Sequence, residues 1–150
     1  MNQVQIKILQ KIADNPHPSL RGCIIDSMGR YCFCDGYRCV KLKVSPPQLF
    51  HTPPSFPLLR FDLLDKILHP YISGEDGERV YPILSDVVDC GEAKKLYVFE
   101  GTDVKVPPGY LYDMMRMFPD AQIYLGSLEP NKKAVRFRSN YGVGYLLPMT

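Results

Sequence analysis

The chain has 150 residues, of which 45% are hydrophobic, and a formal net charge of +2. A chain of this length can bury a core without covalent staples, so we expect one globular domain. No window approaches the roughly 20 apolar residues of a membrane-spanning helix, and the N-terminal segment MNQVQIKILQ lacks the pattern of a secretory signal. These features predict a soluble cytoplasmic protein with no membrane partner.

The charge is distributed unevenly along the chain. Residues 1–43 carry seven Lys/Arg and three Asp/Glu (+4), residues 44–100 carry five and nine (−4), and residues 101–150 carry six and four (+2). This imbalance is too weak to establish nucleic-acid binding, for which a strongly basic face is expected. It does allow a basic surface built from the two ends of the chain.

Residues 3–14 have the periodicity of an amphipathic helix. Lys7 and Lys11 fall outside the apolar stripe, one helical turn apart. A solvated helix face explains such a pair, and contact with phosphates, which needs no sequence specificity, is the alternative. The predicted apolar stripe consists of Val4, Ile8, Leu9, Ile12 and Ala13.

A three-stranded meander is predicted next, with strands at residues 20–26, Tyr31–Cys34 and Arg38–Val44. The Asp35-Gly36 step between the second and third runs is a strong turn signal, because Gly takes positive φ at no steric cost.

The acidic middle of the chain combines a proline-rich stretch with several short patterns. Five prolines within residues 45–60 predict an extended surface loop. Phe61–Leu68 has the spacing of a short helix, and residues 72–80 have the composition of a polar turn. Tyr81–Val88 and Lys95–Glu100 are predicted to form strands or sheet edges.

The last part of the chain predicts a second amphipathic helix at Tyr110–Phe118, with Asp113 and Arg116 pointing away from its apolar side. Ala121–Leu125 and Ala134–Ser139 then read as a hairpin. Tyr141–Met149 is predicted as a final strand, and no internal sequence repeat is evident. The predicted apolar side of the helix consists of Leu111, Met114, Met115 and Phe118.

Four of the five cysteines lie within Cys23–Cys39. Only the Cys32-x-Cys34 pair is close in sequence, whereas a structural zinc site needs two such pairs, and reduced cysteines are commonly buried in cores. We find no nucleophile elbow, phosphate-binding loop or dinucleotide fingerprint. We therefore assign no catalytic residue, metal ligand or cofactor, and a zinc protein or cysteine-based enzyme is a third alternative.

Two segments resemble the bacterial DNA polymerase III sliding clamp family. FCDGYRCVKL resembles the clamp's Thr-Asp-Gly-His/Tyr-Arg-Leu turn, with Cys34 at the Thr position and Cys39 at the Leu position. The second half of a clamp domain resembles the segment GYLYDMMRMFPDAQIYLGSLEPNKKAVRFRSNYGVGYLLPM. The YLLPM ending of this segment resembles the clamp's C-terminal aliphatic-Met-Pro segment. The resemblance covers about residues 3–43 and 105–149.

The resemblance implies an α+β, DNA-clamp-like domain in which two helices pack on a curved antiparallel sheet. Residues 1–150 would form this single domain, with an inserted loop-helix-strand segment at about 44–104. The implied function is non-enzymatic: a DNA-associated processivity or adaptor role in replication, reached through self-assembly into a homo-oligomer, because one domain cannot encircle a duplex. The alternative is a monomeric protein-interaction module that keeps the clamp fold without encircling DNA.

The resemblance also implies two sets of binding residues. Residues contacting double-stranded DNA, independently of sequence, would be Lys7, Lys11 and Arg116. Residues binding short peptides of replication or repair proteins would be Gly36, Tyr37, Arg38, Cys39, Tyr145 and Leu147. A purely structural role is the alternative, in which Tyr37 and Arg38 cap a hairpin while Tyr145 and Leu147 face the core.

Overall fold

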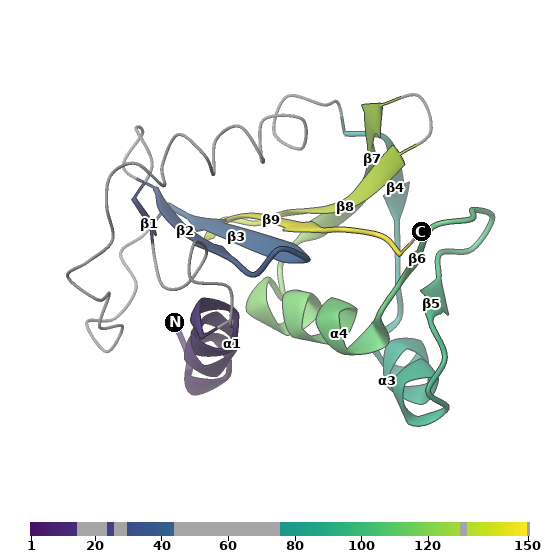
Figure 1. Ribbon diagram of the computed structural model, residues 1–150, viewed down its shortest axis with the longest axis horizontal. Helices are drawn as coiled ribbons and strands as arrows, with labels where there is room; N and C mark the ends of the chain where they lie inside the picture. The colour runs from purple at the N-terminus through teal and green to yellow at the C-terminus, as the bar shows by residue number, and fades with distance from the viewer. Residues whose placement is uncertain (15–23, 26–29, 44–75, 130–131, 150) are drawn as a thin grey trace.

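The computed structural model describes residues 1–14, 24–25, 30–43, 76–129 and 132–149 (Figure 1). These residues form a mixed α+β fold, as expected from the sequence. Their three helices are α1 (Gln3–Ala13), α3 (Leu84–Glu92) and α4 (Pro108–Met117). Their strands are β1 (Ile24–Ile25), β2 (Tyr31–Cys34), β3 (Arg38–Leu42), β4 (Glu78–Val80), β5 (Tyr97–Val98), β6 (Lys105–Val106), β7 (Gln122–Glu129), β8 (Lys132–Arg138) and β9 (Gly142–Leu146).

One open antiparallel sheet organises the molecule, with the strand order β1-β2-β3-β9-β8-β7-β4. The strands β5 and β6 form a separate small antiparallel pair. Helices α1 and α4 lie side by side below the main sheet, and α3 lies beyond α4 (Figure 1). Helices α1 and α4 therefore cover one face of the sheet.

Alternation along the strands gives the sheet two different faces. Phe33, Val40 and Phe137 are fully buried on the face that packs on α1 and α4. Cys39 and Tyr145 belong to a second buried cluster, which lies on the opposite face. Side chains one residue apart on β2, β3 or β9 therefore have different surroundings.

Helix α4 comes close to the sheet at β9. A Cβ atom added to Gly144 would lie 2.6 Å from Met114 Cε and 2.6 Å from Phe118 Cε2. Only glycine leaves room for the methionine and the phenylalanine at this point. This close approach fixes the distance of α4, and of its polar side chains, from the sheet.

The order of elements is repeated, although the sequence shows no repeat. Helix α1 is followed by the antiparallel meander β1-β2-β3, and helix α4 is followed by the antiparallel meander β7-β8-β9. The two halves join where β3 pairs with β9, from Arg38 opposite Leu146 to Leu42 opposite Gly142. Strand β4 extends the sheet beside β7.

The elements predicted for the two ends of the chain are confirmed with small shifts of their bounds. Helices α1 and α4, the β2–β3 hairpin, the β7–β8 hairpin and the final strand β9 all lie where the patterns placed them. In the apolar stripe predicted for α1, the placement of Val4 is wrong, because Val4 is 41% exposed. Its place in the core is taken by Gln5, which is 3% exposed.

The middle of the chain requires two corrections. The prediction of a strand or sheet edge at Tyr81–Val88 is wrong, because α3 begins at Leu84. Its β-branched composition favoured a strand, and periodicity cannot separate a helix from a strand in so short an apolar run. Residues 72–80 were predicted as a polar turn, yet β4 occupies Glu78–Val80. The prediction for Lys95–Glu100 is confirmed in part by β5.

Several predictions fall outside the described residues. These are the loop at 45–60, the helix at Phe61–Leu68 and most of the strand at 20–26. Among the helices that are described, none combines the length and the apolar character needed to cross a membrane.

Candidate functional site

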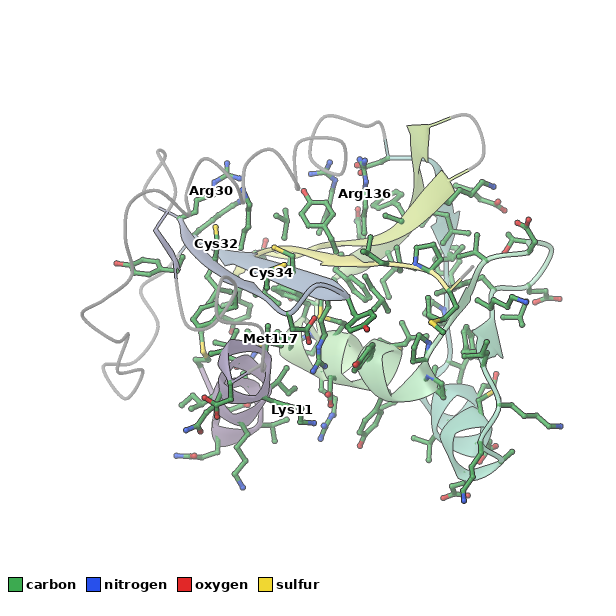
Figure 2. The ribbon with its side chains drawn as sticks, in the orientation of Figure 1. Lys11, Arg30, Cys32, Cys34, Met117 and Arg136 are labelled. Carbon is green, nitrogen blue, oxygen red and sulfur yellow. The ribbon has the colours of Figure 1, made fainter. Side chains whose placement is uncertain are left out.

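Asp113, a buried residue in the middle of α4, is the centre of an ion cluster. Its Oδ2 atom accepts hydrogen bonds from Lys11 Nζ at 3.0 Å and from Arg38 Nη1 at 2.9 Å. Its Oδ1 atom accepts a hydrogen bond from Arg116 Nη2 at 2.9 Å. Figure 2 shows Lys11 on the side of α1 that faces α4. One carboxylate thus joins α1, α4 and the start of β3.

The β2–β3 turn places Arg38 by local chemistry. Asp35 Oδ1 accepts hydrogen bonds from the backbone N–H groups of Tyr37 at 3.0 Å and Arg38 at 2.9 Å. Gly36 has φ 89°, a conformation that glycine adopts without strain. Asp35 Oδ2 accepts a further hydrogen bond of 2.8 Å from Arg38 Nε. The turn therefore aims the guanidinium group before it reaches Asp113.

The cluster is not neutral. Its cations are Lys11, Arg38 and Arg116, and its anions are Asp35 and Asp113, which leaves one positive charge. The Arg38 side chain is 3% exposed, whereas that of Lys11 is 60% exposed and that of Arg116 is 33% exposed. The excess charge is therefore presented to solvent by the two residues on the helices.

Two opposing effects act on the pKa of Asp113. Burial alone would raise the pKa of this carboxyl, but hydrogen bonds from Lys11, Arg38 and Arg116 outweigh burial and hold it below its usual value. Asp113 is consequently ionised at neutral pH, and it keeps its three cations in place.

Aromatic rings border the cluster. The Arg38 guanidinium lies 4.4 Å from the ring centroid of Tyr110, and that of Arg116 lies 4.0 Å from the ring centroid of Tyr112. Tyr37 extends this group, with its ring centroid 5.8 Å from that of Tyr110 and a residue exposure of 56%. The surface of α4 thus combines cations with aromatic rings.

The three residues predicted to contact DNA occupy neighbouring positions on α1 and α4. Lys11 and Arg116 meet at Asp113, and Lys7 lies exposed on α1 one turn before Lys11. Asp113, predicted to point away from the apolar side of the helix, is only 5% exposed because Lys11, Arg38 and Arg116 surround its carboxylate. Its burial depends on partners on other elements, which periodicity alone does not reveal.

The residues predicted to bind peptides lie on neighbouring stretches of backbone, but their side chains point to different faces of the sheet. The C-terminal strand lies beside the turn, since Cys39 pairs with Tyr145 and the Leu147 N–H donates a 2.8 Å hydrogen bond to Tyr37 O. Arg38 is buried on the helix side of the sheet, whereas Cys39 and Tyr145 are buried on the other face. Tyr37 and the half-buried Leu147 stay within reach of solvent.

The cysteines of the β2–β3 hairpin are buried thiols. Cys32, Cys34 and Cys39 are 1%, 7% and 2% exposed. Across the part of the chain that the structure describes, no group of three or more His, Cys, Asp or Glu side chains is arranged to hold a metal ion. Four residues that the sequence analysis weighed as metal ligands or catalytic groups lie outside the described residues: Cys23, His17, His51 and His69.

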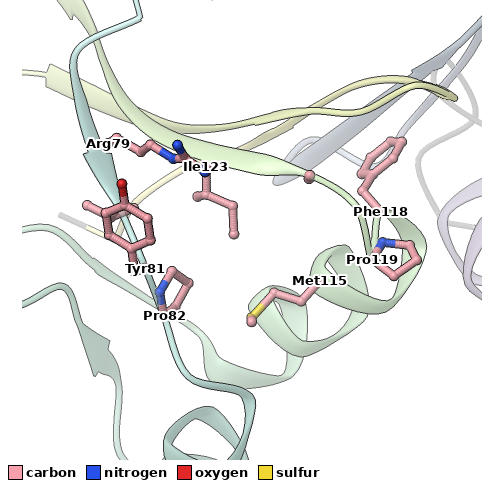
Figure 3. A pocket seen from close by; sticks show the side chains of 9 residues that line it. Arg79, Tyr81, Pro82, Met115, Phe118, Pro119 and Ile123 are labelled. Atoms are coloured by element: carbon pink, nitrogen blue, oxygen red, sulfur yellow. The ribbon is translucent and has the colours of Figure 1, made fainter.

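A separate groove lies between β4, the end of α4 and the start of β7 (Figure 3). It has a volume of about 250 Å³ and is lined mainly by apolar side chains, including Tyr81, Met115 and Ile123. Arg79 stands at its side, with the guanidinium 4.9 Å from the Tyr81 ring centroid. The groove shares none of its lining with the Asp113 cluster.

Sequence reasoning missed the roles of four residues: Gln5, Tyr110, Tyr112 and Asp113. The signal for Asp113 was its position three residues before Arg116, a spacing that brings opposite charges together on a helix. The signal for Gln5 was its position three residues after Asn2, which completes a capping box at the start of α1. Nothing local indicated that Gln5 Nε2 would also donate a 3.0 Å hydrogen bond to Met117 O.

Comparisons of the chain with protein-family models, curated protein sequences and solved structures found no significant match.

Proposed function

We propose that this protein is a non-enzymatic, DNA-associated protein with a domain of the sliding-clamp type, which contacts DNA phosphates through the outer surface of α1 and α4. The observation that carries the proposal is the meeting of Lys11 and Arg116 at Asp113. Cations from two helices are held there at fixed spacing, and both remain accessible to solvent. Lys7 extends the same basic surface by one turn of α1.

The arrangement of the two halves supports the clamp-like part of the proposal. Each half consists of a helix followed by three antiparallel strands, and both helices lie on one face of a shared sheet (Figure 1). The resemblance at the Asp35–Arg38 turn and at the C-terminal segment implies that arrangement. The backbone adjacency of Tyr37 and Leu147 supports it as well.

Encircling a duplex would require several copies of this domain. The outer strands of the described sheet are β1 and β4, and exposed strand edges are ready templates for pairing between chains. A closed ring of copies would place the α1–α4 surface of each toward the DNA. Binding would then depend on phosphates alone and would weaken as salt rises.

The test is binding of fluorescein-labelled duplex DNA of about 20 base pairs, followed by anisotropy at about 50 and 200 mM salt. We expect Lys7→Glu to weaken binding and to reduce the slope of log K against log salt by about 1 or more. Lys7 is the best choice because it is exposed and stands outside the Asp113 cluster. Lys95→Glu, at an exposed position after α3, is the matched control and should leave binding unchanged.

Two measurements together would overturn the proposal. The first is a sedimentation experiment at micromolar concentration that finds only monomer. The second is DNA affinity that stays constant between low and moderate salt. Equal losses in the Lys7 and Lys95 variants would instead mean that the contact is made by overall charge rather than by the α1–α4 surface.

The alternative, a monomeric protein-interaction module, is favoured by exposed apolar side chains. Tyr81, which lines the groove of Figure 3, is 74% exposed, Ile83 is 59% exposed, and Tyr37 on the hairpin tip is 56% exposed. A monomer that binds peptides of replication or repair proteins, and loses this binding in Tyr37→Ala, would support the module. A Tyr37→Ala variant that binds such peptides unchanged would count against it.

A further inference from the structure

Cys34 and Cys39 face each other across the β2–β3 hairpin. Cys34 is the last residue of β2, Cys39 is the second residue of β3, and the two are direct partners in the strand register. They lie on either side of the turn, where Asp35 N donates a 3.2 Å hydrogen bond to Arg38 O.

That hydrogen bond determines the type of pair that the cysteines form. Hydrogen-bonded and non-hydrogen-bonded pairs alternate along an antiparallel ladder. Because Asp35 and Arg38 are a hydrogen-bonded pair, Cys34 and Cys39 are a non-hydrogen-bonded pair, whose Cα atoms are typically about 4.5 Å apart. This spacing falls within the range of about 4.4–6.8 Å that a disulfide bond spans.

The two thiols also share the same surroundings. Both belong to the buried cluster on the sheet face opposite the helices, together with Cys32 and Tyr145. Cys32, on the same strand as Cys34 (Figure 2), is opposite Lys41 of β3 in the register, whereas Cys34 is opposite Cys39. The hairpin thus singles out one pair among three neighbouring cysteines.

The two thiols differ in acidity. The hydrogen bond from Cys39 lowers the pKa of the Cys34 thiol below its usual value, despite the opposing effect of burial. The same bond, together with burial, raises the pKa of Cys39 well above its usual value. Cys34, which is also the more exposed of the two, is therefore the better nucleophile.

We propose that Cys34 and Cys39 are a redox modification site, which forms a reversible disulfide across the β2–β3 hairpin when the protein meets hydrogen peroxide. The proposal does not depend on DNA binding. It rests on the register, on the adjacent turn and on the contact between the two side chains.

The reaction balances in two steps. The Cys34 thiolate attacks one oxygen of hydrogen peroxide, breaks the O–O bond and becomes a sulfenic acid, while the released hydroxide takes a proton to form water. Cys39 then loses its proton and attacks the Cys34 sulfur, and the hydroxyl group leaves with that proton as a second water. The two sulfurs together lose two electrons, which the peroxide gains.

The first step assists the second. Part of the rise in the pKa of Cys39 comes from its hydrogen bond to Cys34 and from the negative charge of the Cys34 thiolate. That negative charge is lost when Cys34 becomes a neutral sulfenic acid, so Cys39 ionises more easily at the moment when it must attack. A dithiol such as dithiothreitol would reverse the modification by thiol–disulfide exchange.

The test is oxidation of the folded, full-length protein with hydrogen peroxide, alkylation of the remaining thiols under denaturing conditions, and mass spectrometry of tryptic peptides. Trypsin cleaves after Arg30, Arg38 and Lys41, so Cys34 and Cys39 fall in different peptides. We expect those two peptides to be joined, with a loss of about 2 Da for the two hydrogens removed, and to separate again after dithiothreitol.

The variants assign the bond, because Cys32 lies in the same tryptic peptide as Cys34. The link should persist in Cys32→Ser and disappear in both Cys34→Ser and Cys39→Ser, with circular dichroism confirming that each variant is folded. A link that instead disappears in Cys32→Ser would overturn the proposal. So would full alkylation of Cys34 and Cys39 under peroxide concentrations that oxidise the less buried Cys90.

Discussion

Arg38, at the start of β3, and Asp113, in the middle of α4, are 75 residues apart in the sequence and are joined by a buried hydrogen bond of 2.9 Å. Their side chains are 3% and 7% exposed, so both charged groups have lost most of their hydration shell. The ion pair between them compensates for that loss. The bond ties the β2–β3 turn to the helix that carries Arg116. The position of the candidate DNA-binding surface therefore depends on it.

Asp113→Asn should be strongly destabilising. The substitution removes the negative charge that Lys11, Arg38 and Arg116 share, and it leaves Arg38 buried with Asp35 as its remaining carboxylate partner. Removing one member of a buried ion pair typically costs about 3–5 kcal/mol, and we expect a loss near the lower end because Asp35 stays. Urea unfolding followed by circular dichroism would measure the loss.

The control for Asp113→Asn is Asp89→Asn on the exposed side of α3. This substitution removes the same charge from the surface, and its effect should stay within about 0.5 kcal/mol. Equal unfolding midpoints for the two variants would contradict a structural role for the Asp113 cluster.

The stability of the folded protein should fall in acid, in part because Asp113 becomes protonated. The pKa of this carboxyl is lower in the folded protein than in the unfolded chain, where it is about 3.9. The stabilisation is therefore complete above about pH 4 and is lost as the pH falls through the lower, folded-state pKa. Urea midpoints measured between neutral pH and about pH 3 should fall less steeply in Asp113→Asn than in the unmodified chain.

A second carboxyl, that of Asp120, also has a lowered pKa in the folded protein and provides a comparison. Hydrogen bonds from Ser139 and from the Asn140 backbone lower the pKa of Asp120, which is exposed. Asp120→Asn should change the loss of stability at low pH less than Asp113→Asn does, because solvent screens the interactions of Asp120. A larger change in the Asp120 variant would show that the acid transition has another origin.

Gly144→Ala should be destabilised by crowding between β9 and α4. Its new methyl group would meet Met114 Cε and Phe118 Cε2 at 2.6 Å, and only the methionine end is flexible. Overpacking of this kind typically costs about 1–3 kcal/mol. Gly109→Ala is a matched control on α4, since nothing lies within 4 Å of its added Cβ atom, and it should be neutral or slightly stabilising. A Gly144 variant as stable as the Gly109 variant would contradict the close contact.

Gln5→Ala should cost more than Asn2→Ala, although both break the capping box of α1. Gln5 accepts a hydrogen bond from Asn2 N and also donates one to the buried carbonyl of Met117, which would be left unpaired. A buried unpaired group costs about 1–3 kcal/mol, whereas loss of an N-cap costs about 1 kcal/mol. Thermal or urea unfolding of both variants checks the order, and a reversed order would contradict the role of Gln5 at Met117.

Patterns that depend on neighbouring residues predicted the ends of the chain well. The spacing of Ile8, Leu9 and Ile12 gave α1, and the Asp35-Gly36 step gave the β2–β3 turn. The same reasoning failed at α3, where a short apolar run could form either a helix or a strand. There the choice depends on what the segment packs against, since Val87 is its only fully buried residue.

The sequence by itself determined the two amphipathic helices, the hairpins and the basic character of the ends, because periodicity, turn chemistry and charge act between residues close in the chain. Only the tertiary structure decided that Asp113 is buried, that Lys11 reaches it from 102 residues away, and that Arg38 and Cys39 face opposite sides of the sheet. A charged side chain is buried only where distant partners neutralise it. Those partners come together through the pairing of β3 with β9 and the close approach of α4 to the sheet.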